Sequence, residues 1–296
     1  MTLQPNSDPS GPDQLRARAQ AALAGLPTLM LSAERLAASL TAGAHGQRRA
    51  GPGEDFWQYR PAHQGDTARS IDWRRSARSD GQFVRDREVQ VAQSAVLWVS
   101  SAAGMEFTGG PDRPAKRDRA DLLALALALA LLSGGERVAL AGGVPRPGRA
   151  QADRIAQALV ARPTLDRDED PPPAEALRPG QRLILVDDFL GDPAPVLAYL
   201  HRAAALGLRG VLLQVLDPDE ESFPYAGAVL FRSGAGGLRH DTRDAAGLRD
   251  AYLARLAERR QMLTRAAEAA GWHFGTHDTA SAPATAALWL WSVLEG

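Results

Sequence analysis

The sequence predicts an α/β protein with a mainly parallel sheet that is covered by helices on both faces. From residue 92 to residue 296, short apolar stretches alternate with longer stretches of helical periodicity, the pattern of repeated β–α–β units. The apolar stretches 182–186 and 210–216 do not alternate with polar residues, so they predict strands that are buried on both faces. With 45% hydrophobic and 23% charged residues, the chain has an ordinary globular composition.

The 296 residues fall into three parts of different composition. Residues 1–13 are polar and rich in proline, serine and aspartate, which predicts a disordered tail. Residues 14–91 begin with apolar helical stretches up to about residue 40 and continue as a segment rich in glycine, arginine and aspartate, which we expect to be irregular. Residues 92–296 are the predicted sheet domain, and we expect the irregular segment to pack against it.

Periodicity and turn residues place the elements of the sheet domain. Strands are expected at 92–99, 137–141, 182–186, 210–216 and 272–277, with an edge hairpin at 228–232 and 237–240. Helices are expected at 118–132, 151–160, 194–206, 248–270 and 284–294. Because parallel sheets bind ligands beyond the carboxyl ends of their strands, the positions of interest are 100–105, 187–189 and 217–220.

Several classes of site are excluded by composition. The chain has no cysteine, which excludes disulfides, zinc–thiolate sites and thiol nucleophiles. His273 and His277 are four residues apart on a predicted strand, where they would lie roughly 13 Å from each other, too far to share one metal ion. Residues 46–91 hold nine arginines against seven acidic residues, too small an excess for a phosphate-binding track, so no nucleic acid is expected.

No membrane span or secretion signal is expected. The longest apolar run, Leu122 to Leu132, is far shorter than the roughly 20 residues that a spanning helix needs. The N-terminus has neither a basic start nor an apolar core that follows it, so we expect a cytoplasmic protein.

Residues 55–78 resemble the signature of the domain-of-unknown-function family 58. The matching residues are Phe56, Arg60, Gly65, Asp66, Arg69, Ile71, Asp72, Trp73, Ser76, Ala77 and Arg78. Ala62 departs from the signature, since an aromatic residue is usual there. The resemblance continues at the strand ends 187–189 and 215–218, and at Tyr252. It implies a von Willebrand A-type fold, and a partnership with a MoxR-type AAA ATPase that assembles or activates an unknown client complex.

The same resemblance draws attention to the loop after the first strand of the sheet domain. Von Willebrand A domains bind Mg²⁺ there through an Asp-x-Ser-x-Ser loop, with further oxygen ligands from other strand ends. The corresponding positions are Ser100, Ser101, Ala102, Ala103 and Gly104, and only Asp188 remains of the usual carboxylates. We therefore expect no metal and no cofactor, against the alternative of a rearranged site that uses Asp187, Asp188 and Ser101.

The signature itself has two interpretations. It could dock a partner protein, with Trp57 and Trp73 as anchors, because interface hot spots favour tryptophan and arginine. It could instead be an internal ion-pair network, which its alternating charges favour. In that network the pairs would be drawn from Asp66, Asp72, Arg69, Arg74 and Arg78.

Two functions from different classes remain open. The first is a non-catalytic adaptor that acts with the ATPase. The second is a metal-dependent hydrolase, or a metal-binding adhesion-type domain, built on Asp187, Asp188 and Asp217. Since residues 217–221 stand beside no nucleophile motif, we expect them to be a solvated loop and assign no catalytic residue. The adaptor is the function that the degenerate loop favours.

Overall fold

The structure is a computed structural model that describes residues 26–40, 56–62, 71–78, 81–87, 93–165, 168–173, 176–232 and 239–295. The chain forms two compact units, and the boundaries lie between residues 43 and 44 and between residues 92 and 93. The larger unit contains the sheet together with the helix at 26–40, and the smaller unit contains the described part of the signature segment.

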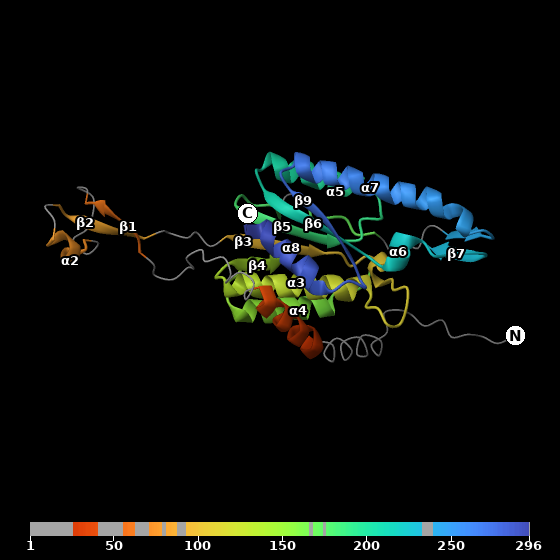
Figure 1. The fold of residues 1–296 in the computed structure, drawn as a ribbon, viewed down its shortest axis with the longest axis horizontal. Helices are drawn as coiled ribbons and strands as arrows, with labels where there is room; N and C mark the ends of the chain where they lie inside the picture. Colours follow the sequence, from red (N-terminus) through yellow and green to blue (C-terminus); the bar gives the residue numbers. More distant parts are fainter. Residues whose placement is uncertain are drawn as a thin grey trace. The chain divides into compact units, whose positions relative to one another are not determined.

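The larger unit is built on a five-stranded sheet in which every neighbouring pair is parallel. The order is β4-β3-β5-β6-β9, as Figure 1 shows, and the strands are β3 (Ser94–Val99), β4 (Arg137–Leu140), β5 (Gln181–Asp187), β6 (Arg209–Leu216) and β9 (His273–Asp278). The predicted α/β class with a mainly parallel sheet is therefore confirmed, and it is consistent with a von Willebrand A-type arrangement. Every strand and helix expected in this domain begins and ends within two residues of its observed bounds.

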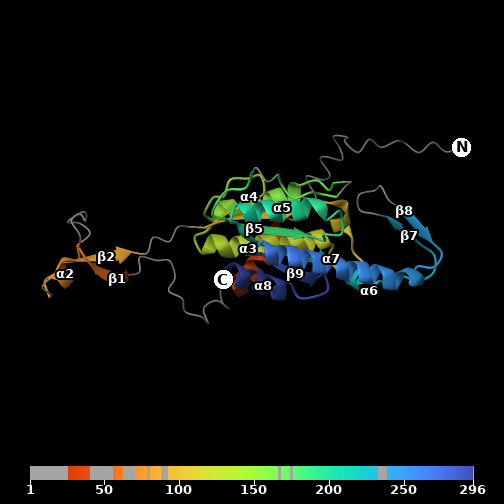
Figure 2. The ribbon, with the colours of Figure 1, turned by 90° about the horizontal axis from the view of Figure 1, so that it is seen from above.

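Helices cover both faces of the sheet, and each face has its own apolar core. One core is formed by α5 (Ala194–Ala205) and α7 (Arg249–Ala269), which lie above the sheet in Figure 1. The other is formed by α3 (Lys116–Ser133), α4 (Arg149–Ala161), α8 (Pro283–Glu295) and the helix at 26–40. Figure 2 shows the same layers from above.

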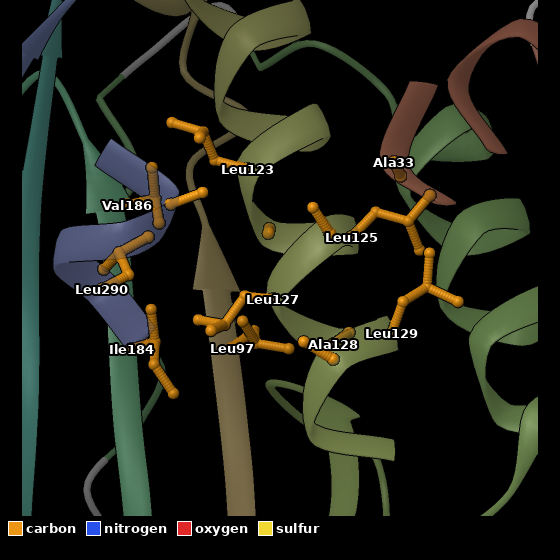
Figure 3. Close-up of a cluster of buried hydrophobic side chains, with 14 of the residues drawn as sticks. Ala33, Leu97, Leu123, Leu125, Leu127, Ala128, Leu129, Ile184, Val186 and Leu290 are labelled. Carbon is orange, nitrogen blue, oxygen red and sulfur yellow. The ribbon is translucent and has the colours of Figure 1, made fainter. Parts of the chain in front are cut away.

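The helix α3 is the centre of the second core. Its leucines and alanines alternate, so the helix is apolar on all sides, and such a helix has to be buried all round. Leu123 and Leu127 point toward the sheet, where Ile184 and Val186 of β5 lie (Figure 3). The apolar run that is too short for a membrane span is therefore core packing. No helix within the described ranges is long and apolar enough to cross a membrane.

Shorter elements surround the carboxyl edge of the sheet. The 3₁₀ helix η1 (Ala103–Glu106) follows β3, and α6 (Pro218–Ser222) follows β6. The expected antiparallel pairing is confirmed, because β7 (Val229–Arg232) pairs with β8 (Arg239–Thr242). The expected place at the edge of the main sheet is wrong, because the two strands form a separate two-stranded sheet. A second 3₁₀ helix, η3 (Ala246–Leu248), leads into α7.

The smaller unit is more regular than its composition predicted. Strands β1 (Phe56–Pro61) and β2 (Phe83–Arg87) form an antiparallel pair, and the single turn of α2 (Trp73–Ser76) lies between them in sequence. The expectation of an irregular segment is therefore wrong here, because charged residues on both strands obscure the alternation that marks a strand. Whether this unit packs against the sheet domain stays a prediction.

Candidate functional site

The candidate site lies at the carboxyl edge of the sheet, where the strand order reverses. The chain runs from β3 outward to β4 and then returns to β5 on the other side of β3, and ligands of such sheets bind at this kind of reversal. Ser100 directly follows β3, and its amide donates to the carbonyl of Val186 at 2.9 Å. The structure thus brings the loop after β3 beside Asp187 and Asp188 at the end of β5, as the sequence predicted.

The loop after β3 is held by contacts that use its own polar groups. Ser100 is fully buried, and its hydroxyl accepts a hydrogen bond from the amide of Ala102 at 3.2 Å. Ser101 donates its amide to the Glu169 carboxylate and accepts from the amide of Leu165 at 2.8 Å. The Ser100 hydroxyl therefore binds the backbone of the loop itself, while the backbone of Ser101 ties the loop to Glu169 and Leu165.

Gly104 shows how closely the loop approaches β5. A Cβ atom at this position would lie 2.9 Å from Oδ2 of Asp188, which is too close for a side chain to fit without movement. The degenerate position thus allows the loop to pack directly against the strand-end carboxylate.

The centre of the site is a buried lysine that the sequence interpretation missed. Lys116 is fully buried at the start of α3, and its Nζ lies 2.7 Å from Asp188 Oδ2 and 2.7 Å from Glu220 Oε1. Burial lowers the pKa of Lys116, but the two carboxylates outweigh burial and raise it overall. The residue is therefore an ammonium ion that joins three segments: α3, the end of β5 and the first turn of α6.

Asp217 continues this network on the side of β6. Its side chain accepts from the amide of Asp219 at 2.9 Å, while Glu220 accepts from the amide of Asp217 at 3.0 Å, which forms a capping box for α6. Arg113 lies 3.3 Å from the same carboxylate, and Thr279 donates to it at 3.1 Å. Asp217 is fully buried, so the expectation of a solvated loop is wrong for this residue, which caps a helix instead.

Asp187 has the most perturbed acidity at this edge. Burial raises its pKa, the neighbouring Asp188 raises it further, and the pKa reaches about 8 in spite of a hydrogen bond with Ser100. Its Oδ1 is buried and has no hydrogen-bond partner. At neutral pH this side chain is therefore largely a protonated acid, which is a poor ligand for a metal ion.

The arrangement does not fit a divalent cation. The ammonium of Lys116 stands between Asp188 and Glu220, and the carboxylate of Asp217 is occupied by donors from Arg113, Thr279 and its own helix. Among the described residues, no group of three or more acidic or histidine side chains could hold a metal ion.

The signature residues lie in the smaller unit. Strand β1 contains Phe56, Trp57 and Arg60. Helix α2 contains Trp73 and Arg74, which are exposed, as is Arg78. The remaining signature positions Gly65, Asp66 and Arg69 lie outside the described residues. The amide of Asp72 donates to the carbonyl of Phe83 at 2.8 Å, which ties the start of α2 to β2. Neither the ion-pair network nor the docking surface is decided by these contacts, and both stay predictions.

One feature of the sequence could have pointed to Lys116. It is the sole lysine of the chain and it opens a helix, where the helix dipole disfavours a cation. A residue in such an unfavourable place requires a specific partner. The identity of that partner could not be predicted, because Asp188 is 72 residues away.

Comparisons with known proteins agree with the signature. Uncharacterised proteins of Mycobacterium bovis and Mycobacterium tuberculosis are each 26% identical to this chain over 268 residues, which cover 84% of the chain and 82% of the relative. An aerotolerance-related membrane protein from Bacteroides fragilis, a solved structure, aligns with a TM-score of 0.44 at 14% identity and covers 69% of this chain and 99% of its own. The family described as "Protein of unknown function DUF58" matches residues 58–262, more than half of the chain, and the protein belongs to this family.

Proposed function

We propose that this protein is a non-catalytic adaptor that acts with a MoxR-type AAA ATPase in the assembly or activation of another protein complex. The partner is the one that the family resemblance implies. The proposal that the protein is non-catalytic is supported by one observation: Lys116 forms internal ion pairs with Asp188 and Glu220 at the carboxyl edge of the sheet. Lys116 neutralises Asp188 and Glu220, and this pairing holds both carboxylates away from a substrate or a water molecule.

The alternative function, a metal-dependent hydrolase built on Asp187, Asp188 and Asp217, has less support. Asp188 and Asp217 already accept hydrogen bonds and ion pairs from protein groups, and the pKa of Asp187 is raised to about 8. Asp188 or Asp217 would have to lose one of these partners, and Asp187 would have to lose its proton, before it could bind a metal ion. The enzyme therefore remains the weaker proposal.

The test is reconstitution of the full chain with a MoxR-type ATPase from the same organism, if its genome encodes one. We expect the two purified proteins to elute together from a sizing column in at least one nucleotide state, and the chain to change the rate of ATP hydrolysis. Separate elution with ATP, with ADP and without nucleotide, together with an unchanged hydrolysis rate, would overturn the proposal.

A matched pair of variants locates the docking surface in the same assay. Trp73 is 57% exposed in the signature, and Leu206 is 41% exposed at the end of α5 in the sheet domain. If the signature docks the ATPase, Trp73→Ala weakens the complex and Leu206→Ala does not, because buried tryptophans at interfaces carry a large share of binding energy.

A further inference from the structure

Residues 108–114 form a short loop at the carboxyl edge of the sheet, between η1 and α3. The two ends of the loop meet, because the amide of Lys116 donates to the carbonyl of Phe107 at 3.2 Å. Compact surface loops whose ends lie together are often functional segments. Met105 before the loop and Lys116 after it are fully buried, whereas none of the residues from 107 to 115 is buried. The loop therefore joins two fixed positions without adding a residue to the core.

The loop is braced by its own hydrogen bonds. The hydroxyl of Thr108 lies 2.8 Å from the carbonyl oxygen of Gly110 and 3.1 Å from that of Arg113. The amide of Arg113 donates to the carbonyl of Gly110 at 3.2 Å. Pro111 and Pro114 restrict the backbone further, because the ring of proline fixes one of its two dihedral angles. The loop can therefore move as one piece.

Polar groups attach the loop to the cap of α6. The amide of Gly109 donates to Asp217 Oδ2 at 3.1 Å. The guanidinium of Arg113 donates to Asp219 Oδ1 at 3.0 Å and lies 3.3 Å from Asp217 Oδ1. Because the loop has no buried residue, its detachment exposes little apolar surface, and segments of this kind open at a much lower free energy than core strands.

The carboxylate of Asp217 is fully buried at this point of attachment. Two of its donors, Gly109 and Arg113, belong to the loop, while Thr279 and the amide of Asp219 belong to the rest of the domain. The side chain of Arg113 is 22% exposed, so solvent reaches the arginine but not the carboxylate that it holds. Removal of the loop would therefore uncover Asp217 and leave its other two hydrogen bonds in place.

We propose that residues 108–114 are a lid over the carboxylate of Asp217, latched by Arg113, which opens without unfolding of the sheet domain. Opening exposes this carboxylate at the edge where parallel sheets bind their ligands. The ion pairs of Lys116 do not involve the lid, so they persist in the open state. The lid requires only the larger unit and is independent of the proposed ATPase partnership.

The first test follows amide hydrogen exchange of the full chain by NMR at increasing, sub-denaturing urea concentrations. The amide of Gly109 should be protected and should exchange at a rate that urea barely changes, because lid opening exposes little surface. The amide of Ile184 in the central strand β5 should exchange through large openings, at a rate that rises steeply with urea. The same steep dependence for both amides would overturn the proposal, and so would an unprotected Gly109 amide.

A pair of adjacent glycines tests the fit of the lid. A Cβ atom at Gly109 would overlap the guanidinium of Arg113 and the carboxylate of Asp219, and would lie 2.6 Å from Asp217 Oδ1. A Cβ atom at Gly110 would meet nothing closer than 3.7 Å. Protection of the amide at position 109 should therefore fall at least about tenfold in Gly109→Ala and stay unchanged in Gly110→Ala. Equal protection in the two variants would contradict the latched position.

The latch itself is tested by Arg113→Gln, with Arg117→Gln as the matched control. Arg117 pairs with Glu106 at 2.8 Å outside the lid, so this control removes a nearby ion pair without affecting the latch. Protection of the Gly109 amide should fall at least about tenfold in the first variant and stay unchanged in the second. An equal fall in both variants would show a general loosening of the sheet edge and would overturn the lid.

The amide of Asp219 separates lid opening from loss of α6. It donates to Asp217 Oδ1 at 2.9 Å within the cap of the helix, so it should stay protected in Arg113→Gln. Loss of protection at Asp219 together with Gly109 would mean that the helix cap unravels with the loop, and residues 108–114 would then not be a separate lid.

Discussion

At the scale of single residues, Lys116 is the most informative side chain of the molecule. Two effects disfavour its positive charge: it lies in the first turn of a helix, where the helix dipole disfavours a cation, and it is buried away from water. Two carboxylates at 2.7 Å offset both costs. The same geometry ties the end of β5 and the turn of α6 to α3, so a single ammonium orders three segments that are distant in sequence.

Removing this ammonium should destabilise the fold strongly. In Lys116→Met the carboxylates of Asp188 and Glu220 lose their counter-ion inside the protein, and we expect the free energy of unfolding to fall by about 3–5 kcal/mol. Urea denaturation measures this change. Arg149→Met is the control, since Arg149 pairs with Glu34 at the surface, and it should cost less than about 1 kcal/mol. A similar fall in the free energy of unfolding of both variants would show that the buried ion pairs of Lys116 stabilise the fold no more than a surface ion pair does.

The acidity of Asp187 should appear as a loss of stability toward alkaline pH. Its pKa is about 8 in the folded protein and near 4 in the unfolded chain, so between these values the folded state retains a proton that the unfolded state releases. Stability therefore falls as the pH rises through this window. Asp187→Asn imitates the protonated acid, so this contribution to the pH dependence of stability should disappear in the variant. The free energy of unfolding of the variant, relative to that of the unmodified protein, should therefore be higher at pH 8 than at pH 5, roughly the upper and lower parts of the window. Urea denaturation measures both. An equal effect at both pH values would contradict the raised pKa.

At the scale of elements, the signature is a small folded unit with its own pairing. The amide of Asp72 donates to Phe83 at 2.8 Å, and the hydroxyl of Ser76 donates to the Asp72 carbonyl at 2.8 Å. The amide of Phe83 in turn donates to the same hydroxyl at 3.0 Å. These bonds connect α2 to β2 independently of any partner.

The two interpretations of the signature predict different melting behaviour. If Asp72 belongs to an internal network, Asp72→Ala should lower the free energy of unfolding of the unit by about 1–3 kcal/mol, since its partners lose a charged acceptor. Trp73→Ala should have a much smaller effect, because Trp73 is 57% exposed. Melting followed by circular dichroism checks both. An unchanged melt for Asp72→Ala, combined with lost binding to the ATPase, would favour the docking surface.

At the scale of the whole molecule, the closed sheet edge predicts a protein that needs no divalent cation. Calorimetric titration with Mg²⁺ or Mn²⁺ should detect no site tighter than about millimolar, the weak end of the range for oxygen ligands. Chelators should leave the melting temperature unchanged. A micromolar site that Asp188→Ala abolishes would restore the rearranged metal site, and with it the hydrolase.

The sheet domain was predictable because its signals are local. Continuous apolar stretches mark β5 and β6, and the leucine–alanine repeat marks α3. The cap of α6 was also readable, since Asp217 and Glu220 have the spacing of a capping box. The pairing of Lys116 with Asp188 could not be predicted, because it depends on which strands become neighbours. The pairing of β1 with β2 could not be predicted either, because the paired residues are too far apart in sequence for a local pattern.

The burial of Lys116 has a practical consequence for chemical labelling. It is the sole lysine of the chain, so the folded protein exposes no side-chain amine, and amine-directed crosslinkers can react only with the α-amino group. The rate at which Lys116 is acylated therefore reports how often the sheet edge opens. An N-hydroxysuccinimide ester should modify this residue slowly in native buffer and rapidly in urea, as mass spectrometry of the fragment that contains it would show. Fast labelling in native buffer would mean that the edge opens without unfolding of the domain. Because the folded protein exposes no side-chain amine, crosslinks that capture a partner have to be made through carboxylates or arginines.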